Sequence, residues 1–230
     1  MSRGGAGAPG APVQAGLIET IRARDGRIPW LGRHVARLRA ASAALDLVEP
    51  ADDLDDLVRL TAGSGDRVVR LELRDGRAEV TTREVNADQA PAIVVSDEVH
   101  RPYPHKTTRR EQFGRALASA RRIGAQDALL VTANGSVAEG TAWNLFWWDG
   151  TGGALCTPAA ELGILPGLGR SRVMELTTVR EEQVPVAALA GRSLFLVNAV
   201  RGIVEIGMLQ GMRVPRDPRT AELSSAFWPD

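Results

Sequence analysis

The chain has 230 residues, 44% of them hydrophobic, which is enough apolar material for one large core or two smaller ones. Its 28 basic and 28 acidic residues cancel, so no net field draws it to nucleic acid or to an anionic membrane surface, and a small molecule is the expected partner. A single cysteine, Cys156, excludes an intramolecular disulfide, and the spacing of histidines and carboxylates predicts no metal site.

The first 15 residues, MSRGGAGAPGAPVQA, are rich in Gly, Ala and Pro, so we expect residues 1–15 to form a disordered tail. This stretch lacks the apolar segment of a signal peptide, and no apolar run elsewhere is long enough to span a bilayer. Together with the single cysteine, this composition indicates a cytoplasmic protein.

Residues 16–100 are expected to form a small α+β domain. The spacing of apolar residues identifies each element, and Asp-Gly pairs mark the turns. In chain order, the expected elements are two strands joined at Asp25-Gly26 (16–29), a helix (31–45), a hairpin turning at Asp75-Gly76 (67–85) and a strand (91–99).

Residues 101–230 are expected to form a larger domain, with the boundary near 97–105, where proline and polar residues cluster. In chain order, its elements are an irregular segment (100–106), a helix ended by Gly124 (113–123), a long apolar hairpin turning at Asn134-Gly135 (127–148), a glycine-rich segment opening a helix (163–176) and an apolar strand interrupted by Asn198 and Arg201 (193–206).

Lys106 is the only lysine of the chain, and the other basic residues are all arginines. Where arginine is favoured so strongly, a lysine is expected to persist where a primary amine must lose its proton and attack a carbonyl, which arginine does not do. The alternative is an accidental survivor on the surface. A Schiff-base lysine indicates, among other carbonyl compounds, pyridoxal phosphate.

A pyridoxal phosphate site needs an amine for the aldehyde, an anionic partner for the pyridine nitrogen, phosphate anchors and a base. Lys106 would supply the amine and the base, and Glu139, inside an apolar strand, would hold the ring nitrogen protonated. A helix starting at Gly167 would bind phosphate through its free N–H groups. Arg37 is a second candidate anchor, and His105 a candidate proton relay. The alternatives are a solvent-facing acid, a plain turn and a solvated helix face.

Five ordered segments resemble the class IV (fold type IV) pyridoxal phosphate family, which includes branched-chain and D-amino-acid aminotransferases and 4-amino-4-deoxychorismate lyase. The segments are GLIETIRARDGRIPWLGRHVARLRAAS (16–42), HKTTRR (105–110), GSVAEGTAWNLF (135–146), TPAAELGILPGLGR (157–170) and FLVNAVRGI (195–203). The resemblance implies a small N-terminal α/β domain, a larger C-terminal pseudo-barrel domain carrying the lysine, and a homodimer with sites near its interface.

The resemblance also implies roles for single residues. Lys106 is the Schiff-base lysine, Glu139 the partner of the pyridine nitrogen, and Arg37 a phosphate ligand. The other cofactor-binding residues are Asn144 on the ring side and Leu168, Gly169, Asn198 and Ala199 in the phosphate cradle. Two departures stand out: many relatives have a hydroxyl residue where Gly169 stands, and many carry a further N-terminal strand.

HKTTRR, RLELRDGRAEV and NAVRG are most similar to the lyase branch of the family. We therefore expect a 4-amino-4-deoxychorismate lyase that releases pyruvate and makes 4-aminobenzoate for folate or for a secondary metabolite. Arg70, Arg109 and Arg110 are candidates for holding the substrate carboxylates. The alternatives are a class IV aminotransferase acting on branched-chain or D-amino acids, and a non-catalytic relative that serves as a binding partner.

Overall fold

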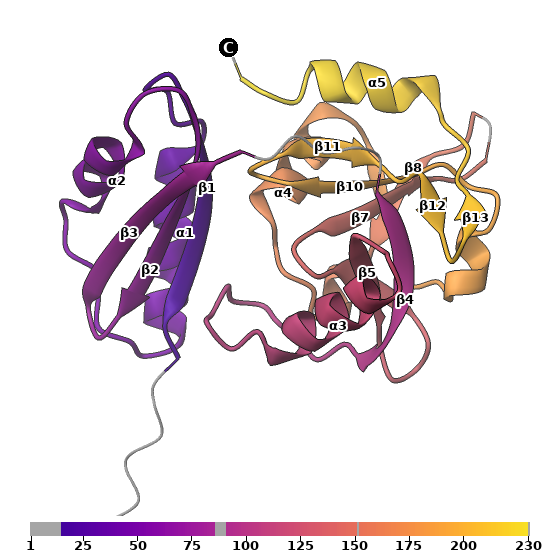
Figure 1. Cartoon of the computed structure of the whole chain (residues 1–230), viewed down its shortest axis with the longest axis horizontal. Coiled ribbons are helices and arrows are strands. Elements are labelled where there is room, and N and C mark those ends of the chain that lie inside the picture. The colour runs from indigo at the N-terminus through magenta and orange to yellow at the C-terminus, as the bar shows by residue number, and fades with distance from the viewer. Residues whose placement is uncertain (1–14, 86–90, 151, 230) are drawn as a thin grey trace, which may run out of the picture.

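The computed structural model describes residues 15–85, 91–150 and 152–229 and arranges them in two lobes, each built on a β-sheet (Figure 1). The smaller lobe holds an antiparallel sheet in the order β1-β2-β3. Its elements are β1 (Leu17–Arg24), α1 (Leu31–Ala44), α2 (Leu54–Ala62), β2 (Asp66–Arg74) and β3 (Arg77–Glu84). Most of the tail predicted for residues 1–15 lies outside the described residues.

Both Asp-Gly pairs of the smaller lobe form the predicted turns. Asp75-Gly76 has φ angles of 48° and 73°, the left-handed pair that a tight two-residue hairpin turn requires, and it joins β2 to β3. Asp25-Gly26 has the same geometry, with φ angles of 46° and 79°. The strand expected after it is reduced to one bridge between Arg24 and Arg27, because the chain turns at once into α1.

The larger lobe is built on a second sheet, in the order β11-β10-β7-β6-β5-β4-β12-β13, with β8 and β9 continuing from β7. Its strands are β4 (Ala92–Val99), β5 (Asp127–Val131), β6 (Val137–Gly140), β7 (Asn144–Trp148), β8 (Leu155–Pro158), β9 (Val179–Glu182), β10 (Leu194–Asn198), β11 (Gly202–Glu205), β12 (Met208–Leu209) and β13 (Met212–Arg213). Its helices are α3 (Glu111–Arg122), α4 (Leu168–Leu176) and α5 (Pro218–Ser225), with short 3-10 turns at η1 (Ala160–Leu162) and η2 (Val186–Leu189).

The change from one sheet to the other comes earlier than the predicted boundary near residues 97–105. β4 pairs in parallel with β5, so residues 92–99 belong to the larger lobe rather than to the N-terminal domain predicted for 16–100. A parallel pair needs a crossover, and α3 provides it between the two strands. The chain therefore passes between the lobes between Glu84 and Ala92.

Two segments predicted as single strands are hairpins. Residues 137–148 divide into β6 and β7, which pair at Glu139 and Asn144 across the turn 141–143. Residues 194–205 divide into β10 and β11, paired from Phe195–Glu205 to Asn198–Gly202. Each turn lies at the end of the sheet that faces the smaller lobe and carries residues into the space between the lobes.

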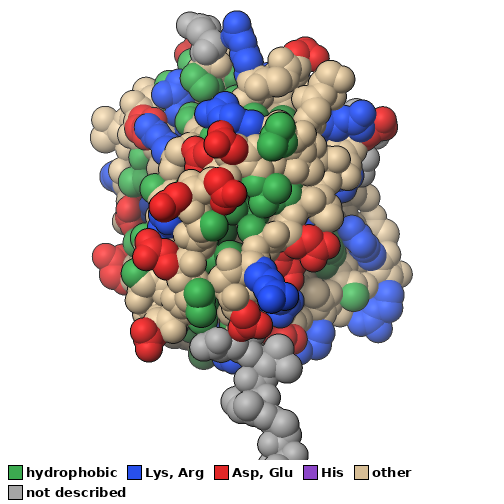
Figure 2. Space-filling view, turned by 90° about the vertical axis from the view of Figure 1, so that its left-hand side faces the viewer, with side chains coloured by type: hydrophobic (Ala, Val, Ile, Leu, Met, Phe, Trp, Pro, Cys, Tyr) green, Lys and Arg blue, Asp and Glu red, His purple; other side chains and the backbone are tan. Residues whose placement is uncertain are grey.

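Each lobe has its own apolar core. In the smaller lobe, α1 and α2 cover the sheet face that carries Ile21, Val69 and Leu71. In the larger lobe, apolar clusters lie on both sides of the sheet, one around Trp147 and another around Phe146. The outer surface of the smaller lobe mixes apolar, acidic and basic side chains (Figure 2). Among the described residues, no helix is both long and apolar enough to cross a membrane.

Candidate active site

A cavity of about 270 Å³ lies where the two lobes meet. Its walls come from β1, α1 and β3 of the smaller lobe and from seven places in the larger lobe: the segment 103–110, α3, residues 126–127, the β6–β7 turn, residue 165, the start of α4 and the β10–β11 turn. Most of the predicted site residues are among those that line it, namely Arg37, Lys106, Arg110, Glu139, Asn144, Leu168, Gly169, Asn198 and Ala199.

Lys106 is held in the cavity by an extension of the smaller sheet. The N–H of Ile18 donates to the carbonyl of Lys106 at 2.8 Å, and the N–H of Thr108 donates to the carbonyl of Gly16, also at 2.8 Å. The N–H of Gly16 in turn donates to the Thr108 hydroxyl at 3.0 Å. The start of β1 is therefore hydrogen-bonded to the lysine segment. In this way the smaller lobe fixes the backbone of Lys106, which belongs to the larger lobe.

The surroundings of Lys106 favour the neutral amine. The pKa of Lys106 falls from 10.5 to about 7, mainly because the amine is buried. The positive charges of Arg110 and Arg37 contribute to this fall, and the negative charges of Glu19 and Glu139 oppose it less strongly. Near neutral pH, Lys106 is thus unprotonated in a large fraction of the molecules. The unprotonated amine is the form that attacks a carbonyl and accepts a proton. Of the two interpretations of the lone lysine, the structure disfavours the surface one.

Glu139 is 3% exposed and faces the cavity from β6. The Nε2 atom of His100 lies 3.0 Å from its Oε1 atom, and the N–H of Leu165 donates to the carboxylate at 3.3 Å. These partners fix the carboxylate while leaving it on the cavity wall. His100 was not predicted; its only signal in the sequence is its place directly after the strand 91–99.

The start of α4 lies against the β10–β11 turn and has no side-chain cap. A Cβ atom on Gly169 would lie 2.8 Å from the carbonyl carbon of Asn198 and 2.9 Å from its Cα, so only glycine lets the two backbones meet here. In this structure the close approach leaves no room for a side chain at position 169, such as the hydroxyl residue of many members of the resembled family. It also brings Leu168 and Ala199, both predicted for the phosphate cradle, to the same wall.

Two asparagines support these walls. The Nδ2 group of Asn144 donates to the carbonyl of Leu165 at 3.0 Å, and its Oδ1 atom lies against Gly167. The Oδ1 atom of Asn198 accepts from the N–H groups of Val200 and Arg201, at 3.0 and 2.9 Å, and its Nδ2 donates to a carbonyl in the β6–β7 turn. Asn198 therefore uses its side chain to shape the turn that forms one side of the predicted phosphate cradle.

Of the three arginines proposed for the substrate carboxylates, only Arg110 lines the cavity. It donates to the carbonyl of Thr141 at 2.6 Å, and its guanidinium carbon lies 4.8 Å from the Phe113 ring centroid. Arg109 is exposed and Arg70 pairs with Glu72 at 2.8 Å, and neither lines the cavity. Both Arg109 and Arg110 precede α3, and only Arg110 contributes to the cavity wall.

The cavity has further basic residues that were not predicted. Arg83 of β3, Arg121 of α3 and Arg201 of the β10–β11 turn line it, and the guanidinium carbon of Arg201 lies 5.5 Å from the Trp143 ring centroid. With so many arginines in the chain, no local sequence signal separates these three from the rest. His105, suggested as a proton relay, is not among the lining residues.

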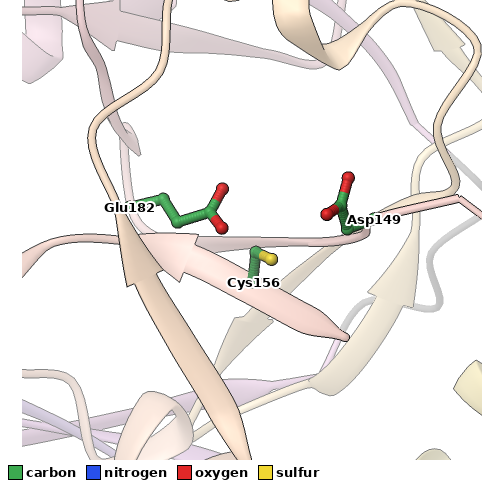
Figure 3. Close-up of side chains that lie close together, drawn as sticks. All are labelled: Asp149, Cys156 and Glu182. Carbon is green, nitrogen blue, oxygen red and sulfur yellow. The ribbon is translucent and has the colours of Figure 1, made fainter. Parts of the chain in front are cut away.

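Outside the cavity, Asp149, Cys156 and Glu182 bring three potential metal-binding atoms within 4.8 Å of one another, and Figure 3 shows their side chains converging. Arg180 lies among them: its Nη2 is 2.7 Å from an Asp149 oxygen, 3.5 Å from a Glu182 oxygen and 3.7 Å from the Cys156 sulfur. Arg192 also lies 3.2 Å from Asp149. Guanidinium groups already supply the positive charge, so this cluster is a salt-bridge network.

Comparisons with known proteins agree with this arrangement. The family model for amino-transferase class IV matches residues 16–208. The fold superposes with a TM-score of 0.83 on a candidate branched-chain amino acid aminotransferase from Thermotoga maritima, at 23% identity over 93% of this chain and 84% of the other. A candidate 4-amino-4-deoxychorismate lyase from Legionella pneumophila gives a TM-score of 0.80 at 23% identity, over 92% and 89% of the two chains.

Another structure described as a candidate 4-amino-4-deoxychorismate lyase covers 99% of both chains at 24% identity, with a TM-score of 0.79. No match is found among curated proteins. At these identities the likeness shows a shared fold, and the fold predicted from the sequence resemblance is confirmed.

Proposed function

The chain belongs to the class IV aminotransferase family, whose enzymes depend on pyridoxal phosphate, and on this premise we propose that it is a 4-amino-4-deoxychorismate lyase. In that reaction the enolpyruvyl ether of the substrate is eliminated, which gives pyruvate and 4-aminobenzoate. An aminotransferase would instead pass the amino group to a keto acid.

The cavity fits the cofactor. It joins an amine of lowered pKa, a buried carboxylate and an uncapped helix start, which match the aldehyde, the pyridine nitrogen and the phosphate. The absence of a Cβ at Gly169 leaves the helix start and the β10–β11 turn together as a backbone cradle for an anion. The residues that we assign to the cofactor are Lys106, Glu139, Asn144, Arg37, Leu168, Gly169, Asn198 and Ala199.

Bound pyridoxal phosphate withdraws electrons from the carbon that carries the substrate amine. The chain's own residues handle the protons. Lys106 Nζ, with a pKa of about 7, accepts the proton from that carbon. The positive charge of Arg110 disfavours the protonated amine and so keeps Lys106 available as a base. Glu139, held by His100 and Leu165, keeps the ring nitrogen protonated.

The basic and aromatic lining of the cavity is the observation that favours the lyase. Four arginines line it in addition to Arg37, namely Arg83, Arg110, Arg121 and Arg201. Arg110 lies over the Phe113 ring and Arg201 over the Trp143 ring. Aminodeoxychorismate has two carboxylates and an unsaturated ring, which such walls match in charge and in shape. A branched-chain amino acid has one carboxylate and an aliphatic side chain, and it needs neither the additional arginines nor the aromatic rings.

Incubation of the purified protein with pyridoxal phosphate and aminodeoxychorismate tests the proposal. We expect pyruvate and 4-aminobenzoate in equal amounts. Arg110→Gln should lower kcat/KM by about tenfold or more, because a charge-assisted contact is lost, while Arg109→Gln, on the exposed neighbour, should leave it unchanged. Absence of both products, together with amino transfer to a keto acid, would establish the aminotransferase instead.

The family relationship also supports two broader expectations. We propose a homodimer, as the sequence resemblance implied, and a sizing measurement on the purified chain tests it. We also propose that the 4-aminobenzoate serves folate synthesis or a secondary metabolite; deletion of the gene should create a requirement for added 4-aminobenzoate in the first case only.

A further inference from the structure

Glu19 is a buried carboxylate outside the set of groups assigned to the cofactor. It is 1% exposed and lies on β1, on the sheet face that packs against α1, where its neighbours in the core are apolar. A carboxylate in such a place is strongly destabilising unless both oxygens are paired. The partners of Glu19 therefore indicate what it does.

Arg37 forms a bidentate ion pair with the two carboxylate oxygens of Glu19. Its Nε atom donates to Oε1 of Glu19 at 2.8 Å, and its Nη2 atom donates to Oε2 at 2.6 Å. This geometry fixes the plane of the guanidinium. The remaining nitrogen, Nη1, points away from Glu19 and donates to the carbonyl of Pro166 at 3.1 Å, directly before Gly167 at the start of α4.

His34 completes the pairing from the preceding turn of α1. Its Nδ1 atom lies 2.7 Å from Oε2 of Glu19, and the ring is fully buried. Burial lowers the pKa of His34, so the ring is neutral and donates one proton to the carboxylate. Burial alone would raise the pKa of Glu19, but the hydrogen bond from His34 and the charge of Arg37 hold it at about 2. Glu19 is ionised throughout the working range of the protein.

We propose that Glu19 is a positioning residue, which with His34 orients Arg37 so that its Nη1 edge faces the start of α4, where the cofactor phosphate binds. The inference rests on the proposed cofactor site, but not on the identity of the substrate. Glu19 also neutralises part of the charge of Arg37, an effect that would weaken phosphate binding. Orientation outweighs this loss, because the guanidinium is already fixed and loses no side-chain freedom when the phosphate binds.

The test compares pyridoxal phosphate with pyridoxal, which has the same aldehyde but no phosphate. Dissociation constants of both are measured by absorbance, without substrate, on the full chain. Glu19→Gln removes the charge and one of the paired acceptors but keeps the size of the side chain. We expect it to weaken the binding of pyridoxal phosphate by about tenfold or more. The dissociation constant of pyridoxal should change by no more than about twofold. Glu72→Gln, which weakens the ion pairs of Arg70 and Arg74 on the other face of the same sheet, is the matched control and should alter neither constant.

Two further variants separate positioning from a general effect on folding. His34→Leu removes the donor to Glu19, and since the ring Nε2 has no partner among the described residues, no other hydrogen bond is lost. This variant should also lower the preference for the phosphorylated compound, by a smaller factor than Glu19→Gln. In an Arg37→Gln background, Glu19→Gln should change the preference no further, because Glu19 acts through Arg37.

Equal weakening of both compounds would show that Glu19 is only structural, and tighter binding of pyridoxal phosphate would show that its charge, not its orienting contact, matters. Either result overturns the proposal. If Glu19→Gln does not fold, an unchanged preference in His34→Leu overturns it. Inability of the unmodified chain to bind pyridoxal phosphate would overturn this inference and the cofactor site together, whereas missing lyase activity with normal cofactor binding would affect only the proposed reaction.

Discussion

The lysine that makes the site reactive also destabilises the cofactor-free protein. Burial is the main reason why the pKa of Lys106 falls from 10.5 to about 7. On folding, the amine must therefore either lose its proton or be buried as a charged group, and both cost free energy near neutral pH. Lys106→Met keeps a similar length of chain without the charge. We therefore expect the variant to bind no cofactor covalently and to be more stable than the unmodified apoprotein.

The size of the effect follows from the two pKa values. Because the folded-state pKa is the lower one, the unfolded chain binds more protons between about pH 7 and 10.5, and stability rises with pH over that interval. At pH 7 the shift corresponds to about 4 kcal/mol, and to about 2 kcal/mol after allowance for the solvent that reaches the cavity. At pH 10 the same calculation leaves less than about 1 kcal/mol.

Urea unfolding of both apoproteins at pH 7, 8.5 and 10 measures this difference. We expect Lys106→Met to be more stable by about 2 to 4 kcal/mol at pH 7 and nearly equal to the unmodified chain at pH 10. Arg109→Met, at the exposed neighbouring arginine, should show no such dependence on pH. If the stability difference between Lys106→Met and the unmodified chain is the same at all three pH values, the lowered pKa of the buried amine is refuted.

Three further changes test other parts of the site. Gly169→Ala should weaken pyridoxal phosphate and lower the melting temperature, because its Cβ would lie 2.8 Å from the Asn198 backbone; normal binding and an unchanged melting temperature would contradict this packing. His100→Leu should leave cofactor binding largely intact but shift its absorbance and lower turnover, because Glu139 loses its buried partner; an unaltered spectrum and rate would show that Leu165 suffices. Chelator treatment should not change the melting temperature, because Arg180 supplies the charge in the Asp149 cluster, and a fall would reveal a bound metal.

Local features of the fold were predictable wherever a few neighbouring residues decide the conformation. The Asp75-Gly76 hairpin and the helix over 31–45 follow from turn chemistry and from apolar spacing alone. The split of 137–148 into two strands was not visible, because the run is mostly apolar and its turn is stabilised by residues distant in sequence. The N–H of Thr141 donates to Asp127, and its carbonyl accepts from Arg110.

The candidate site divides in the same way. Lys106 and Glu139 stand out in the sequence because their chemistry is unusual for their surroundings: one lysine among arginines, and one acid in an apolar strand. Their meeting in one cavity depends on β1, which pairs with the lysine segment across 92 residues of chain, as the bond from Gly16 to Thr108 shows.

The sequence by itself determined the kinds of chemical group, their order along the chain and the family that they resemble. Only the tertiary structure decided which of the many arginines face the cavity: Arg110 does, while Arg109 and Arg70 do not. It alone revealed His100 and Glu19, because a buried charged side chain is identified by its partners and not by its neighbours in sequence. The physical reason is that residue type fixes what a side chain can do, whereas its direction and electrostatic surroundings come from elements far away in the chain.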